Sequence, residues 1–156
     1  MKLHLVSVGK PHDSYVKEGT EMFTKRIAHY FPVQWHIISS TKQVNGNETL
    51  QKQKDAEAIF PLIQKDDYLI VLDERGKQMD SMELAAFLQL RANESKKNIF
   101  FLIGGAYGVH ETLIKRANYT WSLSRLVFPH QLVRLVLSEQ LYRACSILKN
   151  ENYHHE

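Results

Sequence analysis

The sequence predicts an α/β fold in which a parallel sheet carries helices on both of its faces. Two runs of consecutive apolar residues, at 68–72 and 99–103, have the length of strands and lack the polar alternation of a half-exposed strand. Such runs are typical of parallel strands that are covered on both faces. The stretch between them has the spacing of a helix, and strands that alternate with helices indicate an α/β sheet.

The N-terminal half adds elements that their periodicity and end signals define. In order, we expect a strand at 2–8 that stops at Gly9, a helix that opens at Asp13 or Ser14 and ends before Pro32, a strand at 33–39, a mobile loop at 41–47, and an exposed helix that runs to Ile63. The chain has no internal repeat and no linker segment that would divide it, so we expect a single domain spanning residues 1–156.

The C-terminal half continues the alternation. In order, we expect a helix that opens at Ser81, a glycine-rich turn after the second apolar run, a helix that begins near His110, a strand-like run from 122 that breaks at Pro129, and a long helix at 131–149. The segment before Pro129 is open to two interpretations. It is either an ordinary loop that starts a helix or part of a binding site.

Composition excludes several classes of protein. The chain has 156 residues, of which 44% are hydrophobic, so it can bury a core, and its net charge of +3 permits an anionic partner without requiring one. Its one cysteine, Cys145, excludes an intrachain disulfide and favours a cytoplasmic protein. No apolar segment approaches the roughly 20 residues of a membrane span, so we expect no membrane partner. The scattered histidines lack metal-ligand spacing, so we expect no metal.

The sequence FLIGGAYG at 101–108 places three glycines directly after a buried strand. Glycines there allow a sharp turn and let a ligand approach main-chain N–H groups. The spacing G-G-x-x-G differs from the dinucleotide fingerprint, and no acidic residue follows about 20 positions later, so an NAD site is disfavoured. The glycines fit a structural turn or a ligand loop equally well.

The helix at 131–149 is apolar around most of its circumference. One face carries Val133, Val136, Leu137, Ala144, Ile147 and Leu148, and the opposite side carries Leu132, Leu135, Tyr142 and Cys145. One covered face would not hide both sets, so the pattern predicts a second cover, most simply the same helix of a twofold-related subunit. The alternative is a helix buried within one monomeric core.

Two charged residues of the same helix, Glu139 and Arg143, lie four positions apart and can form an ion pair. Most such pairs are solvated and contribute little. Because this pair lies beside apolar surface, a role in function or in an interface is the other interpretation.

Four segments together resemble one family. They are LD-x-x-GK at 72–77, FLIGGAYG at 101–108, SLSRLVFPHQLVRLVLSEQLYRA at 122–144, and the ending YHHE. In this combination and order the chain resembles the RlmH family, also called YbeA, within the SPOUT superfamily of knotted methyltransferases. The resemblance covers nearly the whole chain.

The resemblance implies a SPOUT-type parallel sheet with a C-terminal trefoil knot, and S-adenosylmethionine as cofactor. The implied acceptor is N3 of a pseudouridine in large-subunit ribosomal RNA on the assembled ribosome. The cofactor is expected in loops that correspond here to Leu72, Gly104, Gly105, Leu123, Ser124, Arg125, Leu126, Val127 and Phe128. Rival interpretations are methylation of another RNA such as tRNA, and a ribosome-binding module without catalysis, since a fold does not choose its substrate.

Catalysis is expected to involve the end of the chain. Methyl transfer from a sulfonium is a one-step displacement, and the imide N3–H must lose its proton, so a nearby cation would stabilise the developing anion. The candidates are Arg143, with Glu139 as its partner, and the tail residues Tyr153 and His154. We expect a homodimer in which the tail of one subunit closes over the cofactor held by the other.

Overall fold

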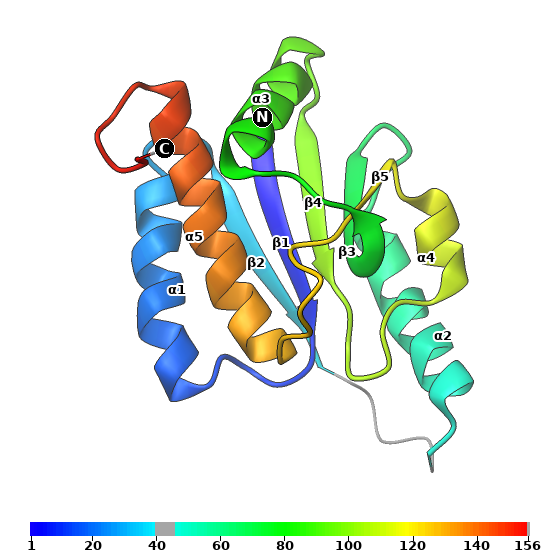
Figure 1. Cartoon of the computed structure of the whole chain (residues 1–156). Helices are drawn as coiled ribbons and strands as arrows, with labels where there is room; N and C mark the ends of the chain where they lie inside the picture. Colours follow the sequence, from blue (N-terminus) through cyan, green and yellow to red (C-terminus); the bar gives the residue numbers. More distant parts are fainter. Residues whose placement is uncertain (40–45, 156) are drawn as a thin grey trace.

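The computed structural model describes residues 1–39 and 46–155, and a five-stranded sheet lies at its centre (Figure 1). The strands are β1 (Lys2–Val8), β2 (Val33–Ile38), β3 (Tyr68–Lys77), β4 (Asn98–Ile103) and β5 (Tyr119–Trp121). Their order is β2-β1-β4-β3-β5, and all neighbouring strands are parallel. The helices are α1 (Ser14–Ile27), α2 (Glu48–Ile59), α3 (Ser81–Asn93), α4 (Glu111–Arg116) and α5 (His130–Leu148), with a short 3₁₀ turn at Phe60–Leu62.

The sheet separates two hydrophobic layers, as the continuous apolar strands predict. Alternate residues of β1 illustrate this: Leu3 and Leu5 face the layer formed with α1, α3 and α5, whereas Val6 and Val8 face the layer formed with α2 and α4. The prediction of a parallel sheet with helices on both faces is therefore confirmed. Among the described helices, none is long and apolar enough to cross a membrane.

Three local predictions were wrong: the end of β3, the exposure of α2, and a strand that was expected from residue 122. Strand β3 does not end at Asp73 but continues to Lys77. Gly76 allows this because its backbone runs close against β5: a Cβ added to Gly76 would lie 2.5 Å from the Thr120 carbonyl oxygen. Helix α2 is not simply exposed, since Ala56 and Ile59 are buried against the sheet. Residues 41–45 of the predicted loop lie outside the described residues.

The third difference concerns residues 122–128, which form a loop rather than a strand. The strand that precedes them, β5, ends at Trp121. Two serines then bend the chain: the Ser122 hydroxyl donates to the Ser124 carbonyl oxygen at 2.9 Å, and the Ser124 hydroxyl oxygen accepts from the Leu126 amide at 3.0 Å. Side chains that bond to nearby backbone in this way favour turns over strands.

A buried arginine fixes the start of α5 against β1. Arg134 is fully buried, and its guanidinium donates to the Ser7 hydroxyl at 2.8 Å and to the Lys10 carbonyl oxygen at 2.9 Å. Gln131 adds a second tie, since its side-chain amide donates to the Pro11 carbonyl oxygen at 3.2 Å. These bonds hold the first turns of α5 at the carboxyl end of the sheet.

Candidate functional site

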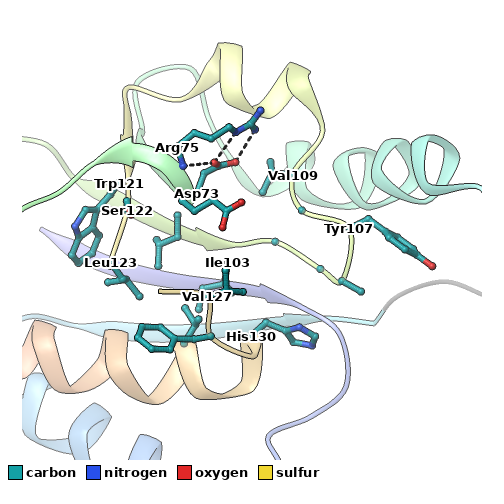
Figure 2. Close-up of a pocket in the computed structure, with 18 of the residues that line it drawn as sticks. Asp73, Arg75, Ile103, Tyr107, Val109, Trp121, Ser122, Leu123, Val127 and His130 are labelled. Carbon is teal, nitrogen blue, oxygen red and sulfur yellow. Dashed lines mark hydrogen bonds and ion pairs between the residues drawn. The ribbon is translucent and has the colours of Figure 1, made fainter. Parts of the chain in front are cut away.

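A cavity of about 670 Å³ lies where β3, β4 and β5 present their carboxyl ends (Figure 2). Its walls come mainly from three segments, at 72–75, 103–109 and 121–128, with α2 and the first turn of α5 contributing at the edges. Ligands of open parallel sheets bind at the carboxyl ends of the strands. The volume falls within the range of about 300–1,000 Å³ that is usual for small-molecule sites.

The structure brings together eight of the nine residues that were expected to hold a cofactor. The eight that line the cavity are Leu72, Gly104, Gly105, Leu123, Ser124, Leu126, Val127 and Phe128. The ninth, Arg125, is exposed and is not part of the lining. Its neighbours Leu126 and Val127 are also strongly exposed, at 71% and 81%, so they form an apolar rim at the mouth of the cavity.

The glycines of the glycine-rich turn are required by the backbone of the turn itself. A Cβ on Gly104 would lie 2.7 Å from Cγ2 of Val109 and 3.0 Å from the backbone of Gly108. Gly108 has a φ of +89°, and its amide donates to the Gly105 carbonyl oxygen at 3.0 Å. A Cβ on Gly105 would face Val8 and Asp55 rather than the cavity. The turn therefore presents main chain to the cavity, and a side chain would displace it.

Sequence reasoning missed several residues of the wall, above all Asp73 and Arg75. Figure 2 shows the Arg75 side chain folded over the Asp73 carboxylate, with Nε to Oδ1 and Nη2 to Oδ2 both 2.9 Å. The Arg75 hydrogen bonds lower the pKa of Asp73 from its ordinary value, although burial acts in the opposite direction. The position of Asp73 after an apolar strand was the signal that could have identified it.

Other wall residues that the sequence did not single out come from distant parts of the chain. They include Trp121 at the end of β5, Tyr107 in the glycine turn, His130 in the first turn of α5, and Glu48 and Lys52 of α2. Burial, and then the Arg134 charge, lower the pKa of His130, so the imidazole is neutral at pH 7. The cavity thus combines apolar walls with a few polar groups at its edge.

The four residues expected to act in catalysis form a separate cluster at the other end of α5. Arg143 donates to Oε1 of Glu139 from Nη2 at 2.6 Å and from Nε at 3.0 Å, which confirms the predicted ion pair. The Tyr153 hydroxyl donates to the same oxygen at 3.0 Å, and Nη1 of Arg143 lies 3.2 Å from Nδ1 of His154. The Arg143 guanidinium also lies over the Tyr153 ring, 4.7 Å from its centre.

The cavity and this cluster lie far apart within one subunit. The cavity touches α5 at His130 and Val133, and Arg143 follows ten residues after Val133 on the same helix, which is about 15 Å at 1.5 Å per residue. Figure 1 shows the C-terminus beside the far end of α5. Among the described residues, no group of histidine, cysteine and carboxylate side chains could hold a metal ion at either place.

The sheet order and the cavity at its carboxyl edge define an α/β protein with a candidate small-molecule site. The model of a family described as "Predicted SPOUT methyltransferase" matches residues 1–154, and the chain belongs to this family. SPOUT methyltransferases use S-adenosylmethionine, so the protein is an S-adenosylmethionine-dependent methyltransferase.

Proteins from several bacteria are similar to this chain over their whole length. The chain is 43% identical over 155 residues to a protein of Cytophaga hutchinsonii named ribosomal RNA large subunit methyltransferase H, covering 99% of this chain and 100% of the relative. A protein of the same name from Parabacteroides distasonis is 40% identical over 157 residues, with both chains covered completely. Among solved structures, a probable methylase family protein from Haemophilus influenzae has a TM-score of 0.56 at 14% identity, covering 99% of this chain and 70% of the other, which supports the fold alone.

Proposed function

We propose that this protein methylates N3 of a pseudouridine in large-subunit ribosomal RNA, acting on the assembled ribosome. The observation that carries the proposal is the full-length similarity to proteins named ribosomal RNA large subunit methyltransferase H. The cavity supports it, because residues of three separate loops that the family resemblance assigned to the cofactor meet there. A ribosomal substrate would place the enzyme in the cytoplasm.

The cavity suits S-adenosylmethionine by its size and by the chemistry of its walls. Apolar side chains such as Leu72, Ile103 and Leu123 suit the purine ring, and the exposed main chain of Gly104 and Gly105 suits its polar groups. The bound cofactor supplies a methyl group on a positively charged sulfur, which is displaced in one step. The contribution of the protein is therefore mainly to align the acceptor nitrogen with the methyl group.

The tail cluster has the groups that the acceptor requires. The imide nitrogen becomes negatively charged as it loses its proton, and the Arg143 guanidinium is a fixed positive charge that stabilises such an anion. Glu139 orients this guanidinium through two hydrogen bonds. Burial and the hydrogen bond to Glu139 raise the pKa of Tyr153, so its hydroxyl keeps its proton at neutral pH and acts as a donor rather than a base.

A dimer would bring the two regions together. Within one subunit the sheet, α1 and α3 already cover residues from both sides of α5, such as Leu137 and Cys145. The sequence-based expectation was therefore too broad, because only part of the apolar surface of α5 is left for a second subunit. The part that remains is an outward stripe, in which Leu132 and Val136 are half-buried and lie on the same helix face as Glu139 and Arg143. We infer that the stripe packs against a second copy and that each tail closes over the cavity of its partner.

The test is to supply labelled S-adenosylmethionine with intact ribosomes, isolated ribosomal RNA or tRNA, and to map the labelled nucleotide. The proposal expects label at one pseudouridine of large-subunit RNA, with intact ribosomes as the best substrate. Label in tRNA would show a different SPOUT specificity. Binding to ribosomes without any transfer would show a non-catalytic module.

A further inference from the structure

A second hollow lies beside the C-terminal tail, between the ends of α1 and α5. It has a volume of about 550 Å³, and we refer to it as the tail groove; its lining consists of Arg26, His29, Tyr30, Tyr142, Lys149 and Glu151. None of these residues lines the cavity at the strand ends. The tail groove is therefore a separate feature.

The lining of the groove holds two cationic side chains, Arg26 and Lys149, against the single carboxylate of Glu151. Among the residues that the structure describes, the side chains of Arg26, His29 and Lys149 form no ion pair and no hydrogen bond. The one acidic residue of the lining, Glu151, accepts a hydrogen bond from the Tyr30 hydroxyl at 2.5 Å. The side chains of Arg26 and Lys149 are exposed, so their donors are available to an anion from outside.

One of these cations, Arg26, lies over an aromatic ring. The Arg26 guanidinium lies 5.4 Å from the centre of the Tyr142 ring, and the rings of Tyr30 and Tyr142 are 6.4 Å apart. Sites for single-stranded nucleic acid combine cations that contact phosphates with aromatic faces on which bases stack. The groove has both components.

The groove is continuous with the tail cluster. The Tyr142 ring lines the groove and also meets the Tyr153 ring edge to face, with 4.7 Å between their centres. The hydrogen bond between Tyr30 and Glu151 ties the chain two residues before Tyr153 to the turn that follows α1. A strand of RNA seated in the groove would thus pass next to Tyr153 and His154.

We propose that the tail groove binds the sugar-phosphate backbone of the ribosomal RNA strand beside the nucleotide to be methylated. Arg26 and Lys149 contact phosphates, and Tyr30 and Tyr142 offer their rings to a neighbouring base. This inference rests on the proposed function, since it assigns to the groove a part of that substrate. A pair of cations at one place would let a protein with a net charge of only +3 bind phosphates locally.

A purely structural role for the same cations makes a different prediction. Arg26 lies in the last turn of α1 and Lys149 at the end of α5, where positive charge stabilises a helix through its dipole. In that case their removal would lower stability and leave the affinity for RNA unchanged. The two roles are therefore separable by experiment.

The test compares two double variants of the full-length protein. In Arg26→Gln with Lys149→Gln the groove loses two charges, and in the control Lys65→Gln with Lys115→Gln two exposed lysines that lie outside the groove are lost instead. We expect the KM for ribosomes to rise about tenfold in the groove variant. The slope of log affinity against log salt concentration should become shallower by about two, since two phosphate contacts are lost. Affinity for S-adenosylmethionine, measured by calorimetry, should not change in either variant. Lys149→Glu alone repeats the test at one exposed side chain.

Direct binding to ribosomes makes the result independent of catalysis. If the groove variant matches the control in KM, affinity and salt slope, or loses only thermal stability, the proposal is overturned. If the wild type binds ribosomes but methylates no ribosomal RNA, the proposed function fails, and the salt slopes of the variants still decide the role of the groove. A wild type that does not bind ribosomes would refute both.

Discussion

The cavity at the strand ends and the tail cluster at the far end of α5 are built in opposite ways. The cavity is formed by loops that present main chain and apolar side chains, and its glycine turn leaves no room for a Cβ at Gly104. The tail cluster consists of charged and aromatic side chains, of which Arg143 and Tyr153 bond to one carboxylate, Glu139. The first is suited to hold a cofactor, and the second to act on an acceptor. About 15 Å of helix separates Val133 of the cavity from Arg143 of the tail cluster, which is why we propose that a second subunit completes each site.

The largest expected effect concerns the cavity. In Gly104→Val, the new side chain would collide with Val109 and with the backbone of Gly108, so the turn must move. A misplacement of about 1 Å in a site can lower the reaction rate by about 100-fold, and we expect the affinity for S-adenosylmethionine in calorimetry to fall by a comparable factor. Circular dichroism serves as the folding control. A folded variant that binds S-adenosylmethionine normally would show that the cofactor lies elsewhere.

Removal of the tail should produce the complementary defect. A chain truncated after Asn152 keeps the cavity and loses Tyr153 and His154, so cofactor binding should persist while kcat on ribosomes falls by about 100-fold or more. The milder Tyr153→Phe variant removes only the hydroxyl that donates to Glu139 and should lose less activity. Equal loss of cofactor binding and of kcat on truncation would contradict the division of labour between the two regions.

The third prediction concerns the helix face that joins the two regions. Val136→Asp places a charge on the outward stripe of α5. Because a charge buried unpaired in an interface costs several kcal/mol, the dimer should dissociate at higher protein concentrations than the wild type does. The control is Leu90→Asp, at an exposed apolar residue of α3. Sedimentation should show weakened association for the first variant only. A wild type that sediments as a stable monomer would refute the dimer.

The smallest expected effect is a loss of stability in acid. Burial lowers the pKa of His12, His36 and His130 below the ordinary value of 6.5. The unfolded chain therefore takes up protons first, so stability is complete above pH 6.5 and declines as the pH falls from 6.5 through the folded-state values. Thermal unfolding between pH 7.5 and 5.5 measures this slope, which should be shallower in His130→Gln. A midpoint that rises on acidification would contradict the assignment.

The sequence predicted most of the sheet because its signals are local. The apolar runs of β3 and β4 and the Pro-initiated helix α5 are visible as patterns. Strand β5 has only three residues, Tyr119–Trp121, which is too short for a period to show. The strand expected after it is a loop, because Ser122 and Ser124 bond to nearby backbone.

The parts of the site that could not be predicted depend on contacts between distant segments. The pairing of Arg75 with Asp73 requires the actual course of the chain after Leu72, and the tail groove requires α1 and α5 to end side by side. The separation of the tail from the cavity follows from the direction of α5, which periodicity does not give. The trefoil knot, implied by the family resemblance, stays a prediction, because hydrophobic patterns carry no information about threading.

The most direct test of a site shared between subunits mixes two inactive proteins. One subunit carries Gly104→Val and the other is truncated after Asn152, and the two are co-expressed with different tags so that heterodimers can form. A heterodimer has one site that combines an intact cavity with an intact tail from the partner. With random pairing, half of the dimers are mixed and one of their two sites is intact, so about one quarter of wild-type methyl transfer should return. If the tail acts within its own subunit, every site remains defective, and the absence of any recovered methyl transfer in purified heterodimers would contradict the account.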